Sequence, residues 1–387
     1  MRNIIFLGLI SFFMDISSEM VYPIIPLYLT SAFGATPAIV GIIEGIAEST
    51  ASLLKVFSGY ITDKYKKKKP IAFIGYATGF FYKVTLLFAS GWAGILTARV
   101  VDRLGKGIRT APRDVMVSES ADKNAMGKAF GVHKALDMAG SAIGILLSFL
   151  LLKQIGNNQA DYKMIFAVSI VPTVLALIMF AFVKEKKEQR ELKKREKFWN
   201  NVSALDGRLK LYLVVVFIFT LGNSSNSFLL LRAKSAGFDD TSVILLYFLY
   251  NLTVSVLSVP FGKLSDRVGR KQILACGYSL FSIVYLGFAF ATKSISFVII
   301  FFVYGIFTAM TAGVERALIA EISPVELKGT MLGLHSTIAG IALLPASVIC
   351  GLLWNRFGSA VPFVFGATMS AVAALLLVVF FKTPQKE

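Results

Sequence analysis

Charged residues are scarce in this chain. Asp, Glu, Lys and Arg together make up 16% of its 387 residues, whereas a soluble globular domain has about 25%. Hydrophobic residues account for 56%, and the mean hydropathy is +0.69. This composition excludes an ordinary soluble domain and predicts a polytopic membrane protein.

Cysteine and histidine are also rare. The two cysteines, Cys276 and Cys350, both lie within apolar stretches, and the chain has two histidines. These numbers argue against a disulfide framework and a His/Cys metal cluster. The sequence also lacks a nucleophile–base set and a phosphate-binding glycine loop. We therefore expect no enzyme activity, no catalytic residue, no metal and no cofactor. The expected energy source is a gradient of protons or of another ion across a membrane.

Apolar stretches long enough to cross a bilayer recur along the whole chain, since a membrane helix needs about 20 such residues. We predict twelve, at residues 4–33, 38–61, 70–91, 93–113, 127–152, 162–183, 210–231, 241–262, 272–291, 294–318, 329–353 and 359–381. One long basic stretch separates them into two sets of six. The predicted domains are therefore a helical bundle at 1–183, a cytoplasmic linker at 184–209 and a second bundle at 210–387.

The net charge of +17 comes from basic residues that lie between the apolar runs. That position does not indicate nucleic-acid binding, which uses basic surfaces. Most Lys and Arg fall in alternate loops, including "KYKKKK" at 64–69 and the linker. The positive-inside rule then places this side, with both termini, in the cytoplasm. We expect a multi-pass protein of the cytoplasmic membrane.

The two halves carry matching residues at a nearly constant offset. The matching pairs are 203 or 202 positions apart: Gly59 and Gly262, Asp63 and Asp266, Arg113 and Arg316, and His133 and His335. Chance does not give several motifs one offset. The sequence therefore predicts a parallel repeat of two six-helix bundles, which places a site between them near the midplane.

The stretch "GKLSDRVGRK" at 262–271 is the most specific motif, and a looser copy, "GYITDKYKKK", stands at 59–68. Gly262 allows close approach of a neighbouring helix. Asp266 is expected to pair with Arg316, and Asp63 with Arg113, as a charged clasp at the cytoplasmic end. The predicted gate residues are Gly59, Asp63, Arg113, Gly262, Asp266, Arg267, Arg270 and Arg316.

This motif resembles the loop signature G-x-L-x-D-R-x-G-R-K of the major facilitator superfamily, and the resemblance extends over essentially the whole chain. It implies an all-α fold of twelve helices and a secondary transporter that works by rocking its two halves. The run "DRLGKGIRTAPRD" resembles a bacterial, drug-exporter-like subgroup whose substrate the sequence does not identify. The antiporter glycine signature of the fifth span is half present: Gly140 and Gly144 fit, and Ile145 replaces its proline.

Charged residues inside the predicted spans are costly unless they face water or a partner. Most belong to the first half, where they are expected to form the proton-coupling and substrate site: Asp15, Glu19, Glu44, Glu48, Lys83, Arg99, Asp102, Arg103, Lys106, His133 and Asp137. Burial disfavours a charged carboxylate and a nearby arginine favours it, so exposure to alternate sides changes proton binding. By resemblance to drug exporters, Asp15 or Glu19 is the membrane acid, and Arg103 or Arg99 is the coupling arginine.

The second half offers hydrogen-bonding and aromatic side chains instead: Asn223, Asn226, Tyr247, Tyr250 and Asn251. An alternative interpretation, in which acids and bases only fix helix packing, applies best to residues near the membrane ends, such as Arg113, Glu315 and Arg316. We do not expect every charge to be functional.

These observations predict a proton-coupled transporter that exports a small organic solute, zwitterionic or amphipathic, by alternating access. Proton-coupled uptake of an organic anion is the alternative, and a lipid flippase or a membrane sensor is the alternative of a different class. The expected partners are the solute and the lipid bilayer, with no nucleic acid, and the expected state is a monomer.

Overall fold

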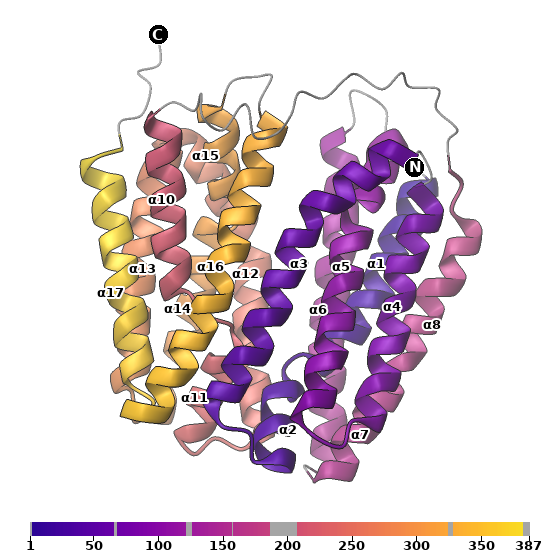
Figure 1. The fold of residues 1–387 in the computed structure, drawn as a ribbon, viewed down its shortest axis with the longest axis horizontal. Coiled ribbons are helices and arrows are strands. Elements are labelled where there is room, and N and C mark those ends of the chain that lie inside the picture. Colours follow the sequence, from indigo (N-terminus) through magenta and orange to yellow (C-terminus); the bar gives the residue numbers. More distant parts are fainter. Residues whose placement is uncertain are drawn as a thin grey trace. The chain divides into compact units, whose positions relative to one another are not determined.

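The structure, a computed structural model, describes residues 2–65, 68–120, 126–156, 158–185, 207–323 and 328–381. Every regular element in these ranges is a helix (Figure 1). The prediction of an all-α protein is confirmed. The helices group into two compact units, and Asp239–Phe248 belongs to the first of them although it follows the linker in sequence.

The first unit contains the N-terminal helices. These are α1 (Arg2–Val21), α2 (Ile24–Phe33), α3 (Pro37–Tyr65), α4 (Lys68–Phe88), α5 (Trp92–Ser120), α6 (Met126–Ile155), α7 (Gln159–Val168), α8 (Ile170–Met179) and the short 3₁₀ helix η2 (Phe180–Phe182). The start of α12 (Asp240–Val268) also belongs here. Its apolar core includes Ile10, Met14 and Tyr76.

The second unit contains the remaining helices and the rest of α12. These are α10 (Gly207–Gly222), α11 (Ser227–Ser235), α13 (Arg270–Phe290), α14 (Ser294–Thr311), α15 (Val314–Ile322), α16 (Lys328–Phe357) and α17 (Val361–Val379). Stacked aromatic rings fill its core; the rings of Phe219 and Tyr278 lie 4.0 Å apart and those of Phe281 and Tyr285 lie 3.9 Å apart.

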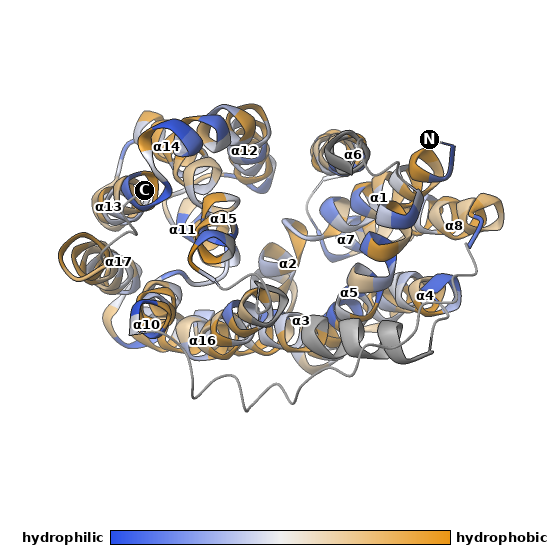
Figure 2. Ribbon diagram, turned by 90° about the horizontal axis from the view of Figure 1, so that it is seen from above, coloured by the Kyte–Doolittle hydropathy of each residue, from blue (hydrophilic) through white to orange (hydrophobic). Residues whose placement is uncertain are grey.

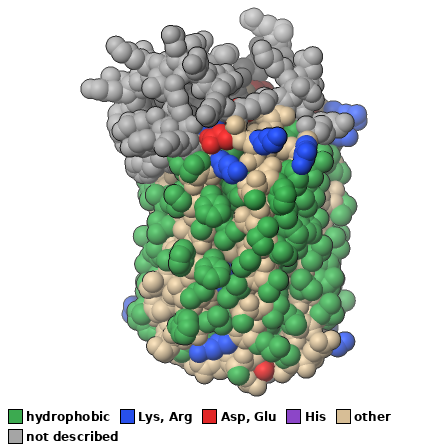
Figure 3. All heavy atoms as spheres, turned by 90° about the vertical axis from the view of Figure 1, so that its right-hand side faces the viewer, with side chains coloured by type: hydrophobic (Ala, Val, Ile, Leu, Met, Phe, Trp, Pro, Cys, Tyr) green, Lys and Arg blue, Asp and Glu red, His purple; other side chains and the backbone are tan. Residues whose placement is uncertain are grey.

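Eleven helical segments in the described residues are long and apolar enough to cross a membrane. Their outward faces carry large apolar side chains; Phe88, for example, is 80% exposed. In Figure 3 such side chains cover the middle of one face, with Lys and Arg mainly near its ends. Figure 2 shows α17 as predominantly hydrophobic. Lipid, rather than water, suits these faces.

Four of the predicted spans are interrupted within the described residues, the sixth at Ser169 between α7 and α8 and the tenth at residues 312–313 between α14 and α15. The first span breaks between α1 and α2, where Pro23 lacks a backbone donor, and α2 ends at Gly34 in the left-handed conformation (φ 58°). The seventh breaks between α10 and α11, and residues 223–225 leave the helix there. Breaks of this kind expose backbone groups, which membrane proteins tolerate only within protein or beside water.

Close helix crossings at glycine position the first-unit helices around α1 and α5. A Cβ atom on Gly140 or Gly144 of α6 would collide with the backbone carbonyls of Phe12 or Ile16 on α1. The half-present antiporter signature therefore has a packing role here. Gly105 of α5 similarly lies against the backbone of Gly75 on α4. Small residues permit such backbone contact in membrane helices.

The tightest crossing in the second unit predicts a stability effect. A Cβ on Gly366 of α17 would lie 2.5 Å from the carbonyl oxygen of Gly222 on α10. We expect Gly366→Ala to destabilise the protein by about 1–3 kcal/mol, because backbone atoms cannot move aside. Thermal unfolding of the purified protein tests this, with Gly333→Ala as control, since no described atom lies within 4 Å of that Cβ position. Equal unfolding temperatures for the two variants would contradict the prediction.

Candidate functional site

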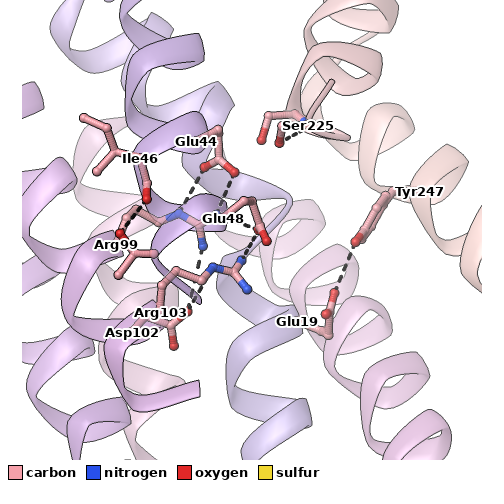
Figure 4. Close-up of polar contacts among 11 residues, drawn as sticks. Glu19, Glu44, Ile46, Glu48, Arg99, Asp102, Arg103, Ser225 and Tyr247 are labelled. Carbon is pink, nitrogen blue, oxygen red and sulfur yellow. Dashed lines mark hydrogen bonds and ion pairs between the residues drawn. The ribbon is translucent and has the colours of Figure 1, made fainter. Parts of the chain in front are cut away.

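A cluster of charged side chains lies inside the first unit, between α3 and α5 (Figure 4). Its innermost pair is Arg99 of α5 with Glu44 of α3. The Arg99 Nε donates to Glu44 Oε1 at 3.0 Å and Nη2 donates to Oε2 at 2.7 Å, and each side chain is 1% exposed. This two-point contact neutralises both groups and fixes the guanidinium plane.

A second pair lies one helical turn along both helices. The Arg103 Nη2 atom is 2.8 Å from Glu48 Oε1, and the Glu48 side chain is 27% exposed. Asp102 links the two arginines, with Oδ2 at 3.7 Å from Arg103 Nε and 4.0 Å from Arg99 Nη1. One ion pair is therefore sealed, whereas the next is accessible.

Tyr22, which the sequence analysis did not single out, lies beside both arginines. Its ring centroid is 5.3 Å from Cζ of Arg99 and 5.9 Å from Cζ of Arg103. Its position three residues after Glu19 places it near the same helix face, and this spacing could have identified it. The ring contributes cation–π attraction to the arginine pair.

Glu19 of α1 accepts a hydrogen bond from Tyr247 Oη at 3.4 Å (Figure 4), and the rings of Tyr22 and Tyr247 are 5.8 Å apart. Tyr247 belongs to the beginning of α12, which is part of the first unit. Nearby at the start of α12, Asp240 accepts a hydrogen bond from the buried phenol of Tyr162 on α7. Asp240 was also absent from the predicted set.

Two carboxyl groups meet between α1 and α6. The side chains of Asp15 and Asp137 are electrostatic neighbours, and one proton between them would join them by a hydrogen bond. Lys134 Nζ also donates to Asp137 Oδ2 at 2.7 Å, and that lysine is 65% exposed. This pair can therefore hold a proton next to a solvated cation.

His133 lies on α6, one turn before Asp137. Its Nε2 shares a hydrogen bond of 3.0 Å with the hydroxyl of Ser11, which in turn lies 3.1 Å from the hydroxyl of Tyr76. Ser11 and Tyr76 were not predicted, because a single serine or tyrosine in a span carries no sequence signal. The network joins α1, α4 and α6, and on α1 and α6 it lies one helical turn before the two aspartates.

Two predicted lysines occupy opposite environments. Lys83 of α4 is fully buried, its Nζ has no hydrogen-bond partner among the described residues, and it lies 4.8 Å from the ring centroid of Tyr82. Lys106 of α5 is exposed and has Arg103, Glu48 and Asp15 as electrostatic neighbours. An exposed ammonium group in the middle of a long helix indicates a water-accessible face.

The polar residues predicted for the second half do not form one group. Asn226 precedes α11 without a capping hydrogen bond from its side chain, which instead accepts from Tyr304 at 2.9 Å. The rings of Tyr250 and Tyr304 are 5.1 Å apart. Asn223 lies in the break between α10 and α11, and Asn251 lies on α12 in the second unit. Tyr247, in contrast, belongs with the first-unit cluster.

The predicted clasp differs from the structure. Asp266 pairs with Arg270 at 3.2 Å, and Arg270 also contacts Glu321 at 2.9 Å and the Ala317 carbonyl. The expected Asp266–Arg316 pair is therefore wrong, because Arg270 at the start of α13 is the nearer cation. Arg267 and Arg316 are both exposed.

The remaining gate predictions have mixed outcomes. The expected close approach at Gly262 is wrong, since no described atom lies within 4 Å of a Cβ built there. Arg113 pairs with its neighbour Asp114 at 2.8 Å. The surroundings of Gly59 and the side chain of Asp63 lie outside what the structure describes, so the Asp63–Arg113 pair stays a prediction.

A model of the Major Facilitator Superfamily matches residues 7–230 and 211–387, which together extend over nearly the whole chain. The chain belongs to the Major Facilitator Superfamily. An uncharacterized transporter of this type from Methanocaldococcus jannaschii is 38% identical over 382 residues, which cover 97% of this chain and 94% of that protein. The superfamily resemblance predicted from the motif at 262–271 is confirmed.

Other members of the superfamily are more distant. A homolog of the multi-drug resistance efflux pump PmrA from Lactococcus lactis is 24% identical and is matched over 84% of this chain and 81% of its own length. A crystal structure of a mutant of the nucleoside transporter NupG has a TM-score of 0.84 at 11% identity, covering 98% of this chain and all of that one. The latter likeness shows the fold alone.

Membership in this superfamily establishes the broad function. The protein is a multi-pass membrane transporter for a small molecule and not an enzyme. The charged cluster therefore lies in a transporter, where intramembrane ionisable groups mark substrate and proton pathways.

Proposed function

We propose that the protein is a proton-coupled secondary transporter that exports a small organic solute by alternating access. Its twelve membrane spans would form two six-helix bundles, residues 1–183 and 210–387, related as parallel repeats and joined by a linker at 184–209. Both termini would face the cytoplasm, and the protein would act as a monomer in the cytoplasmic membrane. The basic loops and repeated motifs support this arrangement.

One observation carries the coupling proposal. Of two consecutive Arg–Glu pairs, Arg99–Glu44 is sealed while Glu48 beside Arg103 is 27% exposed. A carboxylate held by an arginine yet open to water can exchange that cation for a proton or for a cationic group of the solute. The sealed pair would hold α3 and α5 in register during this exchange.

The neighbouring carboxyls of Asp15 and Asp137 provide the second element of the proposal. A shared proton is released when one side opens to a more alkaline compartment. Asp15 and Glu48 are both electrostatic neighbours of the exposed Lys106, so protonation at one place changes the field at the other. Proton binding and solute binding would be linked in this way.

The direction of transport is inferred from a relative and from one exposed lysine. The name of the Lactococcus relative supports export. The exposed Lys106 beside Arg103 instead favours binding of an anionic group and supports uptake of an organic anion as the second candidate.

Purified protein in liposomes tests both candidates. Zwitterionic, cationic amphipathic and anionic solutes are offered with the lumen either acidic or alkaline relative to the outside. Export by antiport predicts accumulation of solute when the lumen is acidic, because protons leaving the vesicle drive solute inward. Uptake by symport predicts accumulation when the outside is acidic. If neither gradient moves any solute class, the proton-coupling proposal is wrong.

A further inference from the structure

The second unit contains a separate group of titratable side chains. Glu315, in the first turn of α15, accepts a hydrogen bond from Tyr278 Oη of α13 at 2.9 Å. His335 of α16 places Nε2 at 3.8 Å from the other carboxylate oxygen of Glu315. Three helices therefore converge on one carboxyl group.

Both members of the Glu315–His335 pair are shielded from solvent. Their side chains are 19% and 10% exposed, and the His335 Nε2 atom has no hydrogen-bond partner among the described residues. A buried histidine nitrogen normally finds such a partner. At 3.8 Å from a carboxylate, this nitrogen gains attraction once it carries a proton.

The ionisable side chains on the surrounding helices are few, and they leave Glu315 and His335 as a separate pair. The helix α10 contributes the buried phenol of Tyr212, α13 contributes Tyr278, and α15 itself contributes Arg316. Glu321, also on α15, is already paired with Arg270 of α13. The helix α14 has no Asp, Glu, Lys, Arg or His in its sequence. His335 is thus the titratable nitrogen that faces Glu315 in the described part of this unit.

The first half does not repeat this arrangement. The residue equivalent to His335 is His133, whose Nε2 is already hydrogen-bonded to Ser11. At the offset of 203, the position equivalent to Glu315 is Pro112, which cannot titrate. Among the described residues, His133 has the carboxylates of Asp137 and Asp114 as electrostatic neighbours, whereas a counterpart of Glu315 itself is lacking in the first unit.

We propose that Glu315 and His335 bind one proton between them and form a second proton site. The proton resides either on His335 Nε2, where the imidazolium faces the Glu315 carboxylate, or on Glu315, where the carboxylic acid faces the neutral imidazole. When the proton leaves to water, the neutral imidazole remains and the Tyr278 hydroxyl still donates to the carboxylate. This site goes beyond the proposed coupling mechanism, whose carboxylates all lie in the first unit.

Infrared difference spectroscopy during a pH titration of the purified full-length protein tests the site without a transport assay. The wild type is expected to show a carboxyl or imidazole titration step that Glu315→Gln abolishes. His335→Gln is expected to shift the midpoint of the carboxyl step by about one pH unit, as for directly interacting groups. Glu321→Gln, an exposed acid on the same helix, should leave the step unchanged.

The Glu315→Gln variant keeps an oxygen that accepts from Tyr278, and its thermal unfolding midpoint verifies that it is folded. A titration curve that is identical in Glu315→Gln and the wild type would overturn the proposal. A midpoint of the carboxyl titration step that is the same in His335→Gln and the wild type would also overturn it. Failure of the vesicle assay would count against the proposed function and leave this spectroscopic test intact.

Discussion

Glu44→Gln is expected to lower the unfolding temperature of the purified protein by roughly 10 °C, corresponding to about 3–5 kcal/mol. The substitution keeps the size of the side chain but leaves the Arg99 guanidinium, 1% exposed, without its carboxylate. Glu48 at 3.9 Å and Asp102 at 4.0 Å lie beyond hydrogen-bond distance of the guanidinium and replace only part of that charge. Thermal unfolding followed by circular dichroism measures the effect.

The matched control is Glu48→Gln, the same chemical change one turn along the same helix. Water reaches this 27% exposed side chain, so we expect a loss of about 1 kcal/mol or less. Adding Arg99→Met to Glu44→Gln should restore much of the lost stability, because it removes the uncompensated charge. Equal effects of the two glutamine variants would show that the inner pair is not a buried ion pair.

The second large effect concerns the coupling of solute transport to the proton gradient. Asp137→Asn and Glu48→Gln are each expected to make transport in liposomes insensitive to an imposed pH gradient, lowering gradient-driven accumulation at least about tenfold while exchange without a gradient persists. An amide at position 137 cannot take up the proton that the Asp15–Asp137 pair would share. An amide at position 48 can neither form the ion pair with Arg103 nor bind a proton in its place. The solute is whichever one the wild type accumulates.

Asp15→Asn provides an internal test, since a single shared proton makes either member of the pair indispensable. Asp239→Asn is the control, because that aspartate lies in an exposed loop before α12. Unchanged pH dependence in both Asp137→Asn and Glu48→Gln would remove the first-unit carboxylates from the coupling role.

The sequence could predict which charges belong to the site but not how they pair. The spacing of Glu44 and Glu48, and of Arg99 and Arg103, places each pair on one helix face. Which arginine pairs with the buried Glu44 and which with the accessible Glu48 depends on how α3 and α5 cross. Local contacts such as Gly107 against Leu54 set that crossing. Helix periodicity does not contain this information. The structure seals Arg99 and leaves Arg103 with the accessible glutamate.

The same limit explains the incorrect prediction for the clasp. The constant sequence offset makes Asp266 and Arg316 equivalent to Asp63 and Arg113 of the first half. A repeat in the sequence does not determine which cation lies nearest to Asp266. Arg270, four residues away across the turn, satisfies Asp266 and also contacts Glu321. Likewise, Glu315 was assigned to packing because its position near a membrane end hides the convergence of Tyr278 and His335.

The assignment of Asp239–Phe248 to the first unit bears on how this chain can be divided. A fragment that stops within the linker contains Tyr162 but lacks Asp240, the acceptor of its buried hydroxyl. It also lacks Tyr247, the donor to Glu19. The N-terminal half alone therefore lacks two side-chain contacts of its own unit, and we expect split halves to accumulate in cells to a higher level when both are produced together.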